Sequence, residues 1–287
     1  MSYRAFLLAV VWMMAGVSPA LSQNFVFTAI PDQDETMLKT RFGKVADYFS
    51  KQLSVPVQYI PVKSYQAAVT AFRNGQVQLA WFGGLTGVQA RMLVPGAQAI
   101  AQGVEDKAFK SYFIAHASTG LRRDSKLPDS VAGMTFTFGS KDSTSGRLMP
   151  EFYLRERFGK TPEEVFRRVG FSGDHSRTIA LVQSGAFQIG VVNYAVWSQE
   201  QEEGNIDISK VSVIWETPEY PDYNWTIRGD VDRRFGPGFT EKVTKAILGM
   251  KDPELLKTFP RETGFIPAKN DDYGPIEAVG KQIGLLE

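Results

Sequence analysis

Short apolar runs with strand character alternate with amphipathic helical segments along most of this 287-residue chain. Asn24–Ile30 is rich in β-branched and aromatic residues and ends at Pro31, which predicts a buried strand. From Leu38 to Leu53, apolar residues recur at spacings of three and four, which predicts one buried face of a helix. Because strands that alternate with helices form parallel βαβ units, the sequence predicts an α/β fold.

The alternation runs to about residue 118 and starts again near Gly120. Further strands are expected at 57–62, 77–82, 97–104, 111–118, 134–138, 163–171 and 187–192, and helices at 64–72, 145–158, 178–184, 240–250, 252–259 and 275–286. Gly75–Ala80 and Gly185–Gly190 share a pattern of glycine, a gap, an apolar residue, glutamine and an apolar residue. This weak internal repeat favours two lobes of similar structure.

The first 22 residues differ from the rest of the chain. A short segment with Arg4 precedes the 13-residue apolar run Ala5–Val17, and small residues follow at Ala20 and Ser22. This is the pattern of a secretory signal peptide, cleaved between Ser22 and Gln23. A membrane anchor is the alternative interpretation, although the run is shorter than the roughly 20 residues that a membrane-spanning helix needs. A soluble exported chain without a lipidated cysteine fits the periplasm.

Charge and composition exclude several classes of protein. Lys and Arg number 32 against 31 Asp and Glu, so no basic excess indicates a nucleic-acid partner. The sequence contains no cysteine, which excludes disulfides, thiolate metal sites and cysteine nucleophiles. The two histidines, His116 and His175, are too far apart in the sequence to indicate a metal site, and His116 is interpreted as structural. No metal or cofactor is expected.

The strongest local feature is the segment Phe138–Gly146, in which a strand ends, hydroxyl side chains cluster and a helix begins. The first turn of a helix has unpaired N–H groups and a partial positive charge. With Ser143, Thr144 and Ser145 as added donors, this turn predicts a site for a tetrahedral oxyanion. Simple N-capping is the alternative, and it requires only one hydroxyl.

Three other segments are weaker candidates. Trp81–Gly87 lies between a strand and a helix, and its glycines either let backbone approach a ligand or form an ordinary turn. His175 lies in a polar turn before a helix, where it either donates to an anion or is a surface residue. The aromatic segment Glu219–Trp225 either lines a cleft or packs as a loop.

Together these motifs resemble the substrate-binding proteins of phosphonate and phosphite ABC importers, which are periplasmic binding proteins of the two-crossover type. The resemblance rests on Ser64–Tyr65, Trp81–Gly83, Phe138–Gly139 followed by Ser143–Gly146, and His175 with its preceding glycine. Ile30–Glu35 and Gly139–Gly146 are also similar to a subgroup that carries a selenate-binding label.

The resemblance implies a bilobed type II periplasmic-binding-protein fold, with two mixed-sheet lobes joined by two crossovers. Lobe one would comprise residues 23–117 and 226–287, lobe two residues 118–225, and 1–22 the signal peptide. The oxyanion would lie between the lobes. The residues that the resemblance places at the ligand are Tyr65, Phe82, Ser143, Thr144, Ser145, His175, Asp222 and Tyr223.

Two departures from the family bear on the ligand. Phe82 stands where relatives often have tyrosine, which removes a hydroxyl donor. Relatives that bind an aminoalkyl phosphonate have a carboxylate where this chain reads Asn193–Ala195, and Tyr223 aligns best with a position that can carry aspartate. Asp222 is adjacent; if it faces the ligand, it favours a protonated phosphorus oxyanion over selenate, and it could also pair an ammonium. The sequence therefore favours a small oxyanion over aminoethylphosphonate.

The predicted function is the periplasmic substrate-binding component of an ABC importer for a small phosphorus oxyanion. Its expected partners are a membrane permease and its ATPase, and the protein is expected to be a monomer. Selenate binding and a sensory role are the alternatives. Ser143 and His175 could form a nucleophile and its base, but no acid partner is identifiable, so an enzyme is not predicted.

Overall fold

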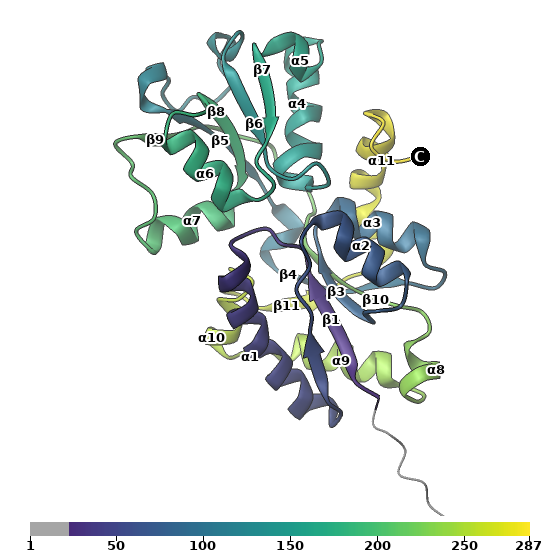
Figure 1. The fold of residues 1–287 in the computed structure, drawn as a ribbon. Helices are drawn as coiled ribbons and strands as arrows, with labels where there is room; N and C mark the ends of the chain where they lie inside the picture. Colours follow the sequence, from purple (N-terminus) through teal and green to yellow (C-terminus); the bar gives the residue numbers. More distant parts are fainter. Residues whose placement is uncertain (1–22) are drawn as a thin grey trace, which may run out of the picture.

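Two α/β lobes lie one above the other in the computed structural model of the chain, which describes residues 23–287 (Figure 1). The signal-peptide prediction falls on residues 1–22, outside the described part. Within residues 23–287, no helix combines the length and the apolar character that a membrane crossing needs.

Lobe one is built on a six-stranded sheet in the order β11-β4-β10-β3-β1-β2. Its strands are β1 (Phe25–Ala29), β2 (Val57–Tyr59), β3 (Leu79–Phe82), β4 (Gln98–Gly103), β10 (Asn224–Ile227) and β11 (Phe265–Pro267). Its α-helices are α1 (Glu35–Leu53), α2 (Tyr65–Arg73), α3 (Gly84–Leu93), α8 (Val231–Phe235), α9 (Phe239–Leu248), α10 (Pro253–Leu256) and α11 (Gly274–Gln282). β1 pairs in parallel with β2 and β3, whereas β10 runs antiparallel between β3 and β4.

Lobe two is built on a five-stranded sheet in the order β7-β6-β8-β5-β9. Its strands are β5 (Ser111–His116), β6 (Thr135–Phe138), β7 (Arg168–Phe171), β8 (Ile189–Asn193) and β9 (Val211–Glu216), and its α-helices are α4 (Met149–Phe158), α5 (Pro162–Val165), α6 (His175–Gln183) and α7 (Tyr194–Glu202). β6 pairs in parallel with β7 and β8, while β5 is antiparallel to β8 and β9. Both sheets are therefore mixed, as predicted.

The periodicity of α1 shows how local sequence determines an element. Asp34 caps the helix by accepting from the amides of Thr36 and Met37. The predicted apolar face, which includes Leu38 and Phe49, is buried against the sheet. This prediction is confirmed.

The assignment of β5 to lobe one is corrected by the strand pairing. The predicted boundary at residue 117 placed residues 111–117 of the expected strand in lobe one, but β5 pairs with β8 and β9 of the second sheet. The chain therefore crosses between the lobes at 104–110, returns at 217–223, and then inserts β10 into the first sheet. An apolar run indicates that a strand is buried, but it does not indicate which sheet the strand joins.

Candidate functional site

The segment Ser143–Gly146 forms the start of a helix, as its sequence predicts. A π-helical turn, Thr144–Leu148, leads directly into α4. Ser143 Oγ accepts from the Gly146 amide at 2.9 Å and so caps this turn. Capping does not account for the other two hydroxyls, because Thr144 Oγ1 accepts from the amide of Leu85 in lobe one at 2.9 Å. Ser145 Oγ is buried and has no hydrogen-bond partner among the described residues.

His175 is the first residue of α6 and is completely buried, so the interpretation as a surface residue is wrong. Asp174 caps the helix, and the His175 amide donates to the backbone oxygen of Asp32 in lobe one at 3.0 Å. His175 Nδ1 accepts from the Asn193 amide at 3.3 Å, which assigns the ring proton to Nε2. Burial lowers the pKa of His175 to about 3, so the ring is neutral at physiological pH. Nε2 is thus a donor, without a partner in residues 23–287.

Lobe one contributes the phenol of Tyr65 and the glycine Gly83. Tyr65 begins α2 and is buried, and its hydroxyl finds no partner in the described part of the chain. Burial raises the pKa of Tyr65 well above its usual value, which keeps it a donor. A Cβ atom on Gly83 would lie 3.2 Å from Thr144 Oγ1 and 3.3 Å from Asp222 Oδ1, so glycine lets the two lobes approach closely there. The glycine thus serves a contact between the lobes, while Trp81 and Phe82 are buried in the core, as the alternative of a glycine turn predicts.

Asp222 faces inward from the second crossover and is 1% exposed. Its Oδ1 accepts from the Gly84 amide at 2.8 Å, and its own amide donates to the Asp106 backbone oxygen at 3.0 Å. Asp222 Oδ2 is buried and lacks a hydrogen-bond partner within residues 23–287. Burial raises the pKa of Asp222 to about 7, against the lowering effect of the Gly84 amide. The carboxyl group therefore changes charge near physiological pH.

Four polar atoms without partners among the described residues belong to this region between the lobes: Tyr65 Oη, Ser145 Oγ, His175 Nε2 and Asp222 Oδ2. The His175 ring lies beside the turn that carries Ser145, since a Cβ atom on Gly146 would lie 3.1 Å from His175 Cε1. Buried polar groups are almost always hydrogen-bonded, so such a cluster marks a place for a polar ligand. Three of these atoms can donate, and the fourth accepts when ionised.

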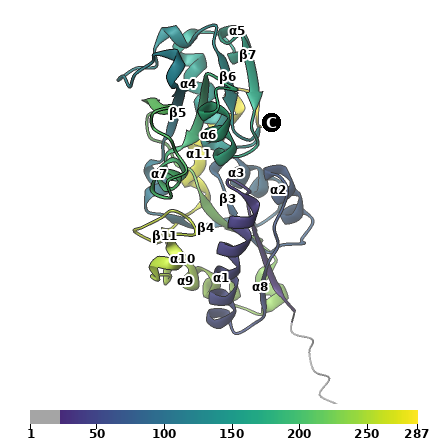
Figure 2. The ribbon, with the colours of Figure 1, turned by 60° about the vertical axis from the view of Figure 1, so that its left-hand side comes forward.

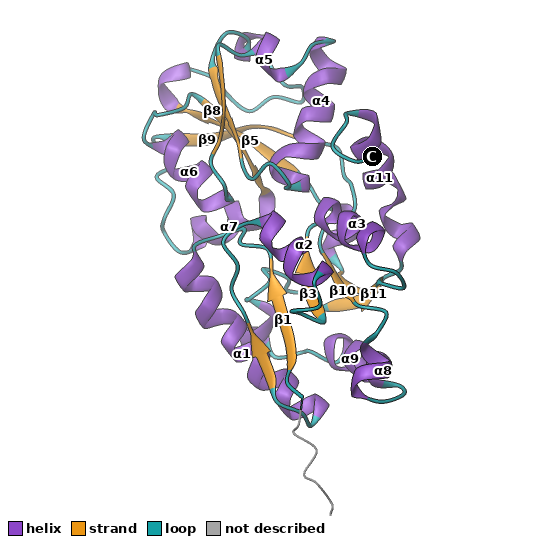
Figure 3. Cartoon of the chain, turned by 45° about the vertical axis from the view of Figure 1, so that its right-hand side comes forward, coloured by secondary structure: helices purple, strands orange, loops and turns teal. Residues whose placement is uncertain are grey.

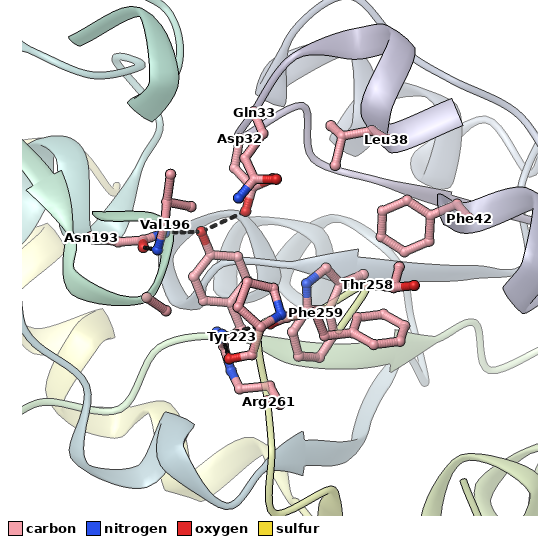
Figure 4. A pocket seen from close by; sticks show the side chains of 13 residues that line it. Asp32, Gln33, Leu38, Phe42, Asn193, Val196, Tyr223, Thr258, Phe259 and Arg261 are labelled. Carbon is pink, nitrogen blue, oxygen red and sulfur yellow. Dashed lines mark hydrogen bonds between the residues drawn. The ribbon is translucent and has the colours of Figure 1, made fainter. Parts of the chain in front are cut away.

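Tyr223 and Phe82 occupy different positions from these donors. Figure 4 shows the Tyr223 hydroxyl between two side chains: it donates to Asp32 Oδ2 at 2.8 Å and accepts from Asn193 Nδ2 at 2.9 Å. The hydroxyl hydrogen of Tyr223 is therefore used by Asp32 and is not available to a ligand. Phe82 is buried against Phe72, with ring centroids 5.6 Å apart.

Asp32 and Asn193 were missed as site-forming residues. Asn193 caps α7 through its side chain, and its backbone amide orients His175. Burial raises the pKa of Asp32 to about 6, although the Tyr223 hydrogen bond opposes this shift. Asp32 lies in Ile30–Glu35, but only the family resemblance singled out that segment. No group of three His, Asp or Glu side chains in residues 23–287 is arranged to hold a metal.

Comparison with known sequences identifies relatives along most of the chain. A family described as "ABC transporter, phosphonate, periplasmic substrate-binding protein" matches residues 27–273. A probable ABC transporter phosphite-binding protein of Prochlorococcus marinus is 42% identical over 278 residues, covering 94% of this chain and 93% of that protein. The phosphonates-binding periplasmic protein of Escherichia coli is 23% identical and covers 68% of this chain and 58% of its own length.

Solved structures agree with this result. PhnD1 from Prochlorococcus marinus, in complex with methylphosphonate, superposes with a TM-score of 0.85 at 41% identity, covering 91% of this chain and 98% of that one. A binding-protein component of a phosphonate ABC transporter from Pseudomonas aeruginosa gives a TM-score of 0.79 at 18% identity, covering 90% and 85% of the two chains. The second likeness concerns the fold alone. The predicted bilobed α/β class is confirmed.

Proposed function

The chain belongs to the periplasmic substrate-binding proteins of phosphonate ABC transporters, and we propose that its ligand is a small phosphorus oxyanion that keeps one ionisable proton. Phosphite and methylphosphonate are the leading candidates, since a relative is named for the first and a related structure holds the second. Family membership implies a small-molecule ligand, a membrane permease with its ATPase, and a periplasmic location. It also implies a binding role and not a catalytic one.

The observation that carries the proposal is the carboxyl group of Asp222 beside the donors. Tyr65, Ser145 and His175 offer hydrogens to anionic oxygens, whereas Asp222 Oδ2 in its ionised form needs one. A phosphorus oxyanion that retains its second ionisable proton supplies both functions, because its P–OH donates and its other oxygens accept. Phosphate groups lose this proton near pH 6, so the protonated species is available at neutral pH.

Selenate and sulfate fit this arrangement less well. Both are fully ionised at neutral pH, so an ionised Asp222 would face their oxygens without a hydrogen between them. Like charges that approach in a buried site cost several kcal/mol unless one group takes up a proton. Binding of selenate would therefore require a protonated Asp222, which becomes scarce above a pH of about 7.

Aminoethylphosphonate lacks a free acid for its ammonium group in this arrangement. An enclosed ammonium needs a paired acid. Asp222 does not serve, because in this proposal its Oδ2 accepts the P–OH of the oxyanion. Among the described residues, the cavity beside Tyr223 and Asn193 is lined by no acid other than Asp32. Asn193 offers an amide there, and the nearby Asp32 already accepts from Tyr223.

Calorimetry with a fixed set of ligands tests the proposal. Phosphite, methylphosphonate, phosphate, selenate, sulfate and aminoethylphosphonate would be titrated into the mature protein at pH 7. We expect phosphite or methylphosphonate to bind most tightly. The proposal fails if selenate, sulfate or aminoethylphosphonate binds as tightly as the best phosphorus oxyanion.

Processing, domain division and assembly form part of the same proposal. Residues 1–22 act as a leader that is removed during export, and the mature protein acts as a monomer. The two lobes, divided at the crossovers 104–110 and 217–223, close over the ligand by a hinge motion.

A further inference from the structure

A second set of contacts joins the lobes through side chains other than the four partnerless ones. Gln33 Nε2 donates to Gln199 Oε1 at 2.9 Å, and Gln33 Oε1 accepts from Arg41 Nη1 at 2.7 Å. Arg41 Nη2 also donates to Glu203 Oε1 at 2.8 Å, so the four side chains form a continuous series of hydrogen bonds. We call these four residues the α1–α7 clasp. Gln33 and Arg41 belong to lobe one, whereas Gln199 and Glu203 belong to lobe two.

The clasp lies at the edge of the interface between the lobes. Figure 3 shows α7 next to the beginning of α1, on the side of the molecule away from α11, and Figure 2 shows the two lobes one above the other from a second side. Gln33 is 4% exposed, and the side chains of Arg41 and Glu203 are 19% and 34% exposed. Because the contacts link one lobe to the other, they break when the lobes separate.

The clasp is independent of the anion site in its chemistry. Arg41 is neutralised by Glu203, so the pair adds no net charge that would attract an anion. Among the hydrogen bonds of residues 23–287, none joins a clasp side chain to Tyr65, Ser145, His175 or Asp222. The contribution of the clasp to closure is therefore the same whichever ligand lies between the lobes.

We infer that the α1–α7 clasp sets the affinity of the protein without setting its selectivity. This inference rests on the proposed function, because it assumes that phosphite and methylphosphonate are bound by the same closed form. A ligand that binds only the closed form loses apparent affinity in proportion to the fraction of molecules able to close. Removing clasp contacts therefore weakens every ligand by one common factor.

Two clasp variants and a matched control test this inference. Gln199→Met keeps the length of the side chain, Arg41→Met keeps the apolar part of the arginine stem, and each removes an interlobe hydrogen bond. Arg157→Met is the control, because Arg157 pairs with Asp129 at 2.7 Å entirely within lobe two. We expect each clasp variant to raise the dissociation constants for phosphite and methylphosphonate by a common factor of about 3–30, the range given by one or two partly exposed hydrogen bonds. Unchanged affinity, or a loss confined to one ligand, would overturn the inference.

Distance measurements without ligand separate this test from the proposed function. The chain contains no cysteine, so Lys51→Cys on α1 and Lys210→Cys before β9, both exposed, provide two unique positions for spin labels. We expect Arg41→Met to lower the fraction of short interlobe distances relative to the labelled parent and the Arg157→Met control. If the parent binds neither phosphite nor methylphosphonate, the proposed function fails, and an unchanged distance distribution in Arg41→Met still refutes the clasp.

Discussion

Replacing Asp222 with asparagine changes one acceptor into a donor while it keeps the rest of the side chain. The carbonyl oxygen of the new side-chain amide can still accept from the Gly84 amide, which donates to Asp222 Oδ1 at 2.8 Å in the native protein. The amide nitrogen then takes the place of Oδ2, which has no partner among the described residues. The variant therefore reverses the hydrogen-bonding polarity at one point of the site.

The expected effect has opposite signs for the two classes of ligand. A hydrogen bond to a charged group contributes about 1.5–3 kcal/mol, so losing the P–OH contact weakens phosphite and methylphosphonate roughly 10- to 100-fold. Selenate and sulfate should bind more tightly in Asp222→Asn, because the amide donates to them where a carboxylate repelled them. A uniform loss for all ligands would refute the proton-sharing argument.

The pH dependence provides a second readout. Because burial raises the pKa of Asp222 from 3.8 to about 7, its ionisation opposes folding into the closed, ligand-free form. The penalty is absent below pH 4, grows between pH 4 and 7, and reaches roughly 4 kcal/mol above pH 7. At high pH, free methylphosphonate and the free Asp222 carboxyl are both deprotonated, whereas their complex holds one proton between them. Binding therefore takes up one proton. The affinity of the native protein should therefore fall about tenfold per pH unit well above pH 7, and that of Asp222→Asn should change less.

Isothermal titration calorimetry at pH 6, 7, 8 and 9 with methylphosphonate and sulfate measures both effects. Asp142→Asn is a suitable control, because it removes a carboxylate from the loop before Ser143 that makes no side-chain contact with Asp222 among the described residues. We expect the control to retain the native pH profile. Parallel profiles for the native protein and Asp222→Asn would show that Asp222 does not hold the shared proton.

The remaining predictions concern the donors, the glycine at the lobe contact and the leader. His175→Ala should weaken methylphosphonate binding about 10- to 100-fold in calorimetry because it removes a donor, with the far-ultraviolet circular dichroism unchanged; native affinity in this variant would place the anion elsewhere. Thr144→Ala should also weaken binding, because it removes the interlobe hydrogen bond from the Leu85 amide. Gly83→Ala should weaken binding because its Cβ atom would lie 3.2 Å from Thr144 Oγ1, whereas Gly43→Ala, with open space around its Cβ atom, should raise the melting temperature and leave affinity unchanged. N-terminal sequencing of protein released by osmotic shock should begin near Gln23, and a retained Met1 on a membrane-bound protein would contradict the leader.

Local features of the site could be predicted, because neighbouring residues determine them. The capping of the helix after Ser143 and the helical face that contains Leu38 depend on hydrogen bonds and periodicity within a few residues. The inward orientation of Asp222 could not be predicted, because it is determined by the Gly84 amide, 138 positions away in the sequence. The sequence left this orientation open and indicated which ligands each orientation would favour.

Strand assignment failed for a related reason. β9 and β10 were not recognised as strands, and β5 was placed in the wrong sheet. All three flank a crossover and pair antiparallel with strands distant in the sequence, so their neighbours carry no signal of the pairing. The clasp could not be predicted for the same reason. Arg41 and Glu203 are 162 positions apart in the sequence, and only the contact between the lobes distinguishes them from ordinary surface charges.

Closure of the lobes therefore reflects two opposed contributions. The clasp and the Leu85–Thr144 hydrogen bond favour the closed form with or without ligand. Burial of Asp222 beside donors that lack partners among the described residues opposes it, and this penalty grows as the carboxyl ionises. A protonated phosphorus oxyanion removes the penalty, because its oxygens accept from the donors and its P–OH donates to the carboxylate. A fully ionised oxyanion accepts from the donors but leaves its own negative charge facing that of the carboxylate. Selectivity then follows from the cost of closing over the wrong ligand, whereas the clasp changes the affinity for every ligand by the same factor.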